Sequence, residues 1–149
     1  LNPFTNEAQI DGLVPIFKFP TTGSHEVAHQ LGYAAENEAN FIGSLAAMHN
    51  PDSYFVYSGH AFILRHCLAE VYKRDPESYE QLIGKVNKGI LKKYQEVREF
   101  WDSYENPAEP LFKSTYNNFL KSNNQSGGKE RYRYVEALIV NYHKNKLGQ

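Results

Sequence analysis

The run SHEVAHQLGYAAENEANF, residues Ser24–Phe41, decides the fold of this chain. Serine is a favoured N-cap residue, and the residues after it have the apolar spacing of a helix of about two turns. Glycine is common just after a helix ends, so Gly32 is expected to stop this helix. A second helical stretch covers residues 34–49 and stops at Asn50-Pro51. The run therefore predicts two helices joined by a short turn.

His25, Glu26 and His29 form the pattern HExxH on the first predicted helix. Residues four apart share a helix face, so the two imidazoles can hold one zinc ion at about 2.0–2.1 Å. The Glu26 carboxylate can then accept a proton from water activated by the metal. The pattern predicts His25 and His29 as metal ligands and Glu26 as the general base. Two unrelated histidines on a surface helix would give the same pattern.

Glu36, at the start of the second predicted helix, is expected to be the third zinc ligand. It shares a face with Asn40, Gly43 and Ala47, and small residues let two helices approach closely. Asn40 could hydrogen-bond the second ring nitrogen of a ligand or brace the Glu36 carboxylate. Glu38 points about 200° away from Glu36 on a helix, so only one of them can face the metal. Alternatively, both acids simply favour the N-terminal end of the helix dipole.

The stretch from His25 to Phe41 resembles the core of the zincin metallopeptidases in their gluzincin-like arrangement. There a second helix carries ExxAD or ExxAN, which Glu36, Ala39 and Asn40 match, and the resemblance implies that Glu36 is the third ligand. More closely, the chain resembles a bacterial family of unknown function, thought to be membrane-anchored zinc peptidases. That resemblance extends to Pro3–Ala8 and, weakly, to Tyr54–His60 and the Tyr-rich final helix. It implies a zincin-like helical core behind upstream transmembrane helices, and no particular substrate.

Two features limit the resemblance. The connection from His29 to Glu36 is shorter than in many gluzincins. The start HExxHxxG also resembles the metzincins, but their third ligand would fall at Ala35, which cannot bind a metal. The expected function is zinc-dependent peptide hydrolysis on a peptide or protein substrate. The alternatives are a zincin-fold metal-binding module for recognition or sensing, and a structural zinc domain; three protein ligands leave a position open, which favours catalysis.

The remaining chain predicts a mainly α fold with a small N-terminal β element. Short extended runs over Phe4–Ile10 and Leu13–Phe19 flank Asp11-Gly12, a pair typical of hairpin turns, and Pro20 ends them. Such strands would either pair with an extended substrate or only cover the helices. The sequence also predicts helices over 58–74, 77–104, 111–121 and 131–146, of which 77–104 is either one helix or two with a break near Gly84 and Gly89. A loop is expected over 122–129, and the whole chain, 1–149, is expected to be one domain.

A peptidase of this kind also needs a hydrogen-bond donor for the oxyanion of the tetrahedral intermediate. The sequence offers His60 first, because it would begin a helix after Ser58-Gly59 and face a cleft. Arg131 could bind a substrate carboxylate. The other candidate donors are Tyr57, Tyr132 and Tyr134, although tyrosines this abundant are more often packing residues.

Composition restricts the partners of the chain. The formal net charge is -1, which gives no basic surface for nucleic acid. Cys67 stands alone, so no intrachain disulfide can form, and it is expected to be a buried small hydrophobe. No stretch approaches the roughly 18 apolar residues of a membrane span. We expect a domain excised from a longer chain and anchored to a membrane by upstream segments, on a side that the sequence does not indicate.

Overall fold

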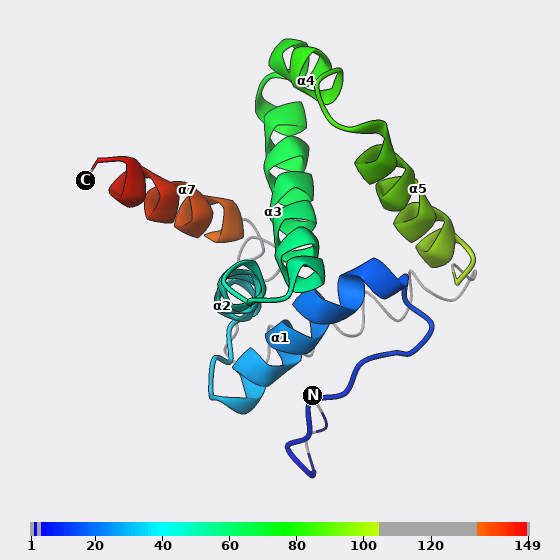
Figure 1. Cartoon of the computed structure of the whole chain (residues 1–149), viewed down its shortest axis with the longest axis vertical. Coiled ribbons are helices and arrows are strands. Elements are labelled where there is room, and N and C mark those ends of the chain that lie inside the picture. The colour runs from blue at the N-terminus through cyan, green and yellow to red at the C-terminus, as the bar shows by residue number, and fades with distance from the viewer. Residues whose placement is uncertain (1, 3, 105–133, 149) are drawn as a thin grey trace, which may run out of the picture.

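The fold is mainly helical, as predicted (Figure 1). The computed structural model describes residues 2, 4–104 and 134–148. The helix expected over 111–121 and the loop expected over 122–129 lie outside the described residues. The described elements are a short 3-10 helix η1 (Ile16–Lys18) and the helices α1 (Phe19–Gln30), α2 (Glu36–Met48), α3 (Ser53–Arg74), α4 (Pro76–Ile83), α5 (Lys88–Asp102) and α7 (Tyr134–Leu147).

The predicted N-terminal β element is wrong, because the described residues contain no strand. Residues before η1 form turns instead: the Asn6 amide donates to the Asn2 carbonyl, and the Asp11 carboxylate accepts from the Leu13 amide. Pro20 does not end a strand but lies in the first turn of α1, where its missing N–H costs nothing. An edge strand that pairs with an extended substrate is therefore absent from this part of the chain.

Side-chain caps fix where the later helices begin. The Asp52 carboxylate accepts from the Tyr54 amide, so α3 starts at Ser53 and not near residue 58 as predicted. Asp75 caps α4 in the same way, and Asn87 caps α5. The predicted stretch 77–104 is thus two helices with a break after Gly84, the second of the two alternatives.

Glycines let the first three helices pack closely. α2 packs against both α1 and α3 (Figure 1). A Cβ on Gly43 would lie 2.7 Å from the His25 backbone nitrogen, so α2 can touch α1 only because this position has no side chain. A Cβ on Gly59 of α3 would lie 3.0 Å from the Met48 backbone nitrogen of α2. The prediction that small residues allow close helix approach is confirmed, and Ala39 and Ala47 on α2 are fully buried.

We predict that Gly43→Ala destabilises the fold by about 1–3 kcal/mol, because its new methyl group meets backbone atoms of α1 that cannot rotate away. The displacement falls at His25, so zinc affinity should decrease as well. Chemical denaturation measures the free energy of unfolding. Gly84→Ala is the control, since its Cβ would lie 3.6 Å from the nearest atom, in ordinary contact. Equal stability of the two variants would contradict the close approach of α1 and α2.

Candidate metal centre

His25 and His29 point from one face of α1 toward Glu36 in the first turn of α2. The Nε2 atom of His25 lies 3.4 Å from Glu36 Oε2, and that of His29 lies 3.5 Å from Glu36 Oε1. The ligand atoms of all three residues lie within 4.8 Å of one another. The structure therefore brings together the three residues predicted as metal ligands. Glu38, the rejected candidate, is exposed.

The spacing of these atoms fits a tetrahedral metal. Ligands about 2.0–2.1 Å from zinc and at tetrahedral angles are about 3.3–3.4 Å from each other. The distances of 3.4 and 3.5 Å between the Glu36 oxygens and the two imidazoles are close to that edge length. The imidazole rings are nearly perpendicular, at 87°, with centroids 4.5 Å apart. The ring nitrogens and the carboxylate can thus converge on one ion with small adjustments.

The turn after α1 orients His29. The Gly32 amide donates to the His29 carbonyl and the Tyr33 amide to the Ala28 carbonyl, a Schellman motif. This motif needs the positive φ of 104° that glycine adopts without strain at position 32. It turns the Tyr33 carbonyl back onto His29 Nδ1, at 2.7 Å. A carbonyl only accepts, so Nδ1 carries a proton, and in the neutral ring Nε2 presents a lone pair toward Glu36.

This tautomer places two electron-rich atoms close together at the centre. In a neutral His29 ring, Nε2 and the Glu36 carboxylate are both acceptors, and they face each other at 3.5 Å. Either a second ring proton or a metal cation between them removes the repulsion. The hydrogen bond with His25, and the charges of His25 and His29 to a smaller extent, hold the pKa of the Glu36 carboxyl below its usual range against partial burial. Glu36 therefore stays in the anionic form that a metal requires.

The expected role of Asn40 is met only in part. Asn40 lies in the cleft beside His25, Glu26 and Glu36. However, the buried Nδ1 of His25 has no hydrogen-bond partner among the residues that the structure describes. Asn40 thus occupies the predicted neighbourhood without making the predicted bond to a ligand ring.

Glu26 lies in the same cleft as His25 and Glu36 and is half-buried, which suits a base beside a metal. The sequence missed four other residues of this cleft. Thr21 and Thr22 precede His25 by about one turn of α1, so a helical reading that placed Pro20 in the first turn would have found them. Lys18 precedes His25 by about two turns, in η1, and falls in a stretch predicted to be extended. The fourth comes from α3, where nothing in the local sequence marks it. They are Lys18, Thr21, Thr22 and Phe62.

The two predicted oxyanion donors that the structure describes, His60 and Tyr57, do not reach the centre. His60 is exposed on α3 and does not line the cleft. It is two residues from both Ser58, which bonds Thr21 of α1, and Phe62, so it points to the far side of the helix. Tyr57 instead packs against Phe17, with ring centroids 6.3 Å apart. The remaining candidates, Arg131, Tyr132 and the Tyr134 side chain, lie outside the described part of the chain.

Comparison with known proteins places the chain in a family. Residues 1–140 match the family described as "Protein of unknown function (DUF3810)". The chain belongs to this family. A second match is 30% identical over 81 residues to "Probable polyketide synthase 5" of Dictyostelium discoideum; it covers 54% of this chain and 3% of that protein. No solved structure matches.

The family assignment confirms the resemblance to a family of unknown function and leaves the rest as predictions. A zincin-like arrangement of the core and a membrane anchor both stay untested. Among the described residues, no helix is long and apolar enough to cross a membrane.

Proposed function

We propose that this DUF3810 domain binds zinc through His25, His29 and Glu36 and hydrolyses peptide bonds. The observation that carries the proposal is the convergence of the three ligand atoms within 4.8 Å, from two helices, with the Glu26 carboxylate in the same cleft. Three protein ligands leave a position open for substrate, which suits catalysis better than a closed structural site. Glu36 is the most exposed of the three, at 44% against 15% and 14%, so the centre opens on the side of Glu36.

The chemistry divides between the metal and the chain. Zinc bound there supplies a Lewis acid that polarises a carbonyl and makes water more acidic. Glu26 accepts the proton of the attacking water and passes it to the leaving amine, a role that needs a carboxylate beside the ligands but not bound to the metal. The Tyr33 carbonyl keeps His29 in the tautomer that donates a lone pair.

Metal analysis of the purified protein, together with a peptide-library cleavage assay, tests the proposal. We expect about one zinc per chain, loss of cleavage after chelation, and recovery when zinc is returned. Zinc that binds without any cleavage across the library would favour the alternative, a metal-binding module for recognition or sensing. Absence of stoichiometric metal would contradict both the zinc peptidase and the metal-binding module.

A further inference from the structure

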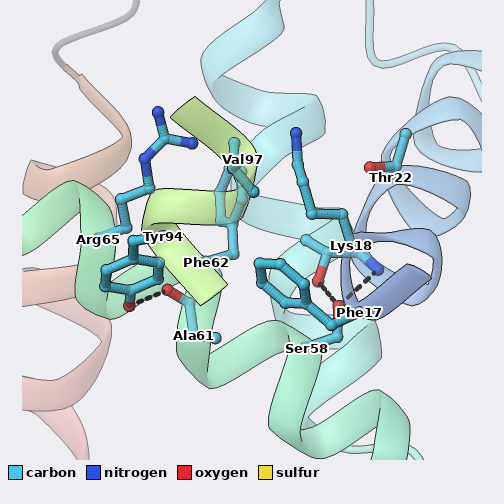
Figure 2. Close-up of a pocket in the computed structure, with 10 residues that line it drawn as sticks. Phe17, Lys18, Thr22, Ser58, Ala61, Phe62, Arg65, Tyr94 and Val97 are labelled. Carbon is cyan, nitrogen blue, oxygen red and sulfur yellow. Dashed lines mark hydrogen bonds between the residues drawn. The ribbon is translucent and has the colours of Figure 1, made fainter. Parts of the chain in front are cut away.

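A second pocket lies beside the metal centre, between η1, α1, α3 and α5 (Figure 2). Its inner wall is apolar and consists of Phe17, Ala61 and Val97, which form one buried cluster. Tyr94 closes one side and donates its hydroxyl to the Ala61 carbonyl at 2.6 Å. The interior offers about 20 Å³, room for about one water molecule, so a larger group can reach the rim of this pocket but not its interior.

The pocket and the metal-site cleft are neighbours. Lys18, Thr21, Thr22 and Phe62 line both of them. The mutual hydrogen bond of the buried Thr21 and Ser58 hydroxyls, at 2.7 Å, holds α1 to α3 at this point. A chain whose peptide bond lies over His25 and Glu36 can therefore place a neighbouring group at the rim of the pocket.

Two cations stand at the rim of the pocket. The side chains of Lys18, from η1, and Arg65, from α3, extend in the same direction past its apolar wall (Figure 2). The ion pairs of Glu36, Glu70, Glu96 and Glu136 are with other residues. The Lys18 ammonium lies 5.6 Å from the Trp101 ring centroid, a cation–π contact with a neutral ring. Partial burial, and to a smaller extent Arg65, lower the pKa of Lys18, which is the effect of two like charges beside an apolar wall.

We propose that the rim of this pocket, where it meets the metal-site cleft, binds a carboxylate of the substrate next to the scissile bond, through Lys18 and Arg65. This inference rests on the proposed peptidase function. An anion between the two cations turns their repulsion into two charge-assisted hydrogen bonds. The carboxylate is either an acidic side chain or the C-terminus of the peptide, and the two sources require separate substrates.

Matched peptides test the preference. We compare a pair of acetylated, amidated peptides that differ only by Glu or Gln next to the cleaved bond, and a second pair with a free or amidated C-terminus one residue after it. One acidic member should have a kcat/KM about tenfold or more above its neutral partner. Its identity tells whether a side chain or a C-terminus is bound. Equal rates within both pairs would overturn the proposal.

Variants assign the preference to the two cations. Lys18→Met and Arg65→Met should each reduce the acid-to-neutral ratio toward one. Lys92→Met removes the same charge from an exposed position of α5 that does not line the pocket, and should keep the ratio. A ratio that survives both pocket variants, or falls equally in Lys92→Met, would show that overall charge and not this pocket selects the substrate.

A binding experiment separates this proposal from the peptidase proposal. Calorimetry of the chelator-treated protein measures binding of the acidic and neutral peptides without metal or turnover. We expect binding of the acidic peptide only, and its loss in Lys18→Met. Acid-selective binding without cleavage in the zinc-loaded protein would support the carboxylate site and contradict the peptidase proposal. Cleavage without acid selectivity would support the peptidase proposal and contradict the carboxylate site.

Discussion

Glu26→Gln should reduce peptide hydrolysis by about 10²- to 10⁴-fold, the usual contribution of a general base, without changing zinc content. The amide has nearly the same shape as the carboxylate but cannot accept the proton of the attacking water. Glu26 lies on α1 directly after His25 and lines the cleft with His25 and Glu36, yet it is not one of the three converging ligands. Its loss should therefore affect the reaction and not the metal.

The measurement pairs kcat/KM on the best library peptide with zinc stoichiometry of the same sample. Glu38→Gln is the matched control, because it makes the same chemical change at an exposed carboxylate on α2. Wild-type rates in Glu26→Gln would exclude Glu26 as the base and reject the mechanism. Loss of zinc in this variant would instead make Glu26 a ligand, contrary to the geometry of the centre.

Sequence alone could predict that His25, His29 and Glu36 come together, because each position depends on local geometry. His25 and His29 need only one helical turn between them. Glu36 needs a tight return of the chain, and Gly32 provides it by the Schellman motif that ends α1. The remaining requirement, that α2 lies against α1, is also visible in the sequence as Gly43, whose hydrogen atom leaves room for the His25 backbone.

The sequence failed where two local interpretations competed. Pro20 can end an extended segment or begin a helix, and short apolar runs fit both a strand and a coil packed on helices. Tertiary packing decides, and here the Thr21 amide and hydroxyl both bond Ser58 of α3, which fixes α1 from its first turn. The same applies to His60: Ser58-Gly59 looked like a helix start, but Asp52 caps α3 earlier and Gly59 serves close packing instead.

The pocket beside the metal centre could not be predicted at all. Its residues come from η1, α1, α3 and α5, so they follow no regular spacing in the sequence. Lys18 falls in a stretch predicted to be a strand, and Arg65 looks like any solvated arginine of an amphipathic helix. Only the packing of Phe17 against Ala61 and Val97 brings the two cations to one rim.

Glu36→Ala should lose zinc during dialysis against a mild chelator, whereas Glu38→Ala should retain it. The Glu36 carboxylate places one oxygen 3.4 Å from His25 Nε2 and the other 3.5 Å from His29 Nε2, the position of a third ligand. Glu38 lies about 200° around the helix and is exposed, so its loss removes only a solvated charge. Even loss of a group that merely orients a ligand typically costs about 10- to 100-fold in metal affinity, and loss of a ligand should cost more.

The two variants remove equal charge from the first turn of α2, so any effect of the helix dipole is the same in both. Their difference in zinc stoichiometry therefore reports ligation alone. Circular dichroism of the zinc-free proteins should show equal helix content, because the ends of both side chains face solvent or the cleft and not the core. If Glu36→Ala keeps zinc and Glu38→Ala releases it, the register of α2 against α1 is wrong and the carboxylate assignment must be reversed. If both keep zinc, the metal is held by the two histidines without a carboxylate from α2. The open side of the centre would then be wider than a peptidase of this kind requires.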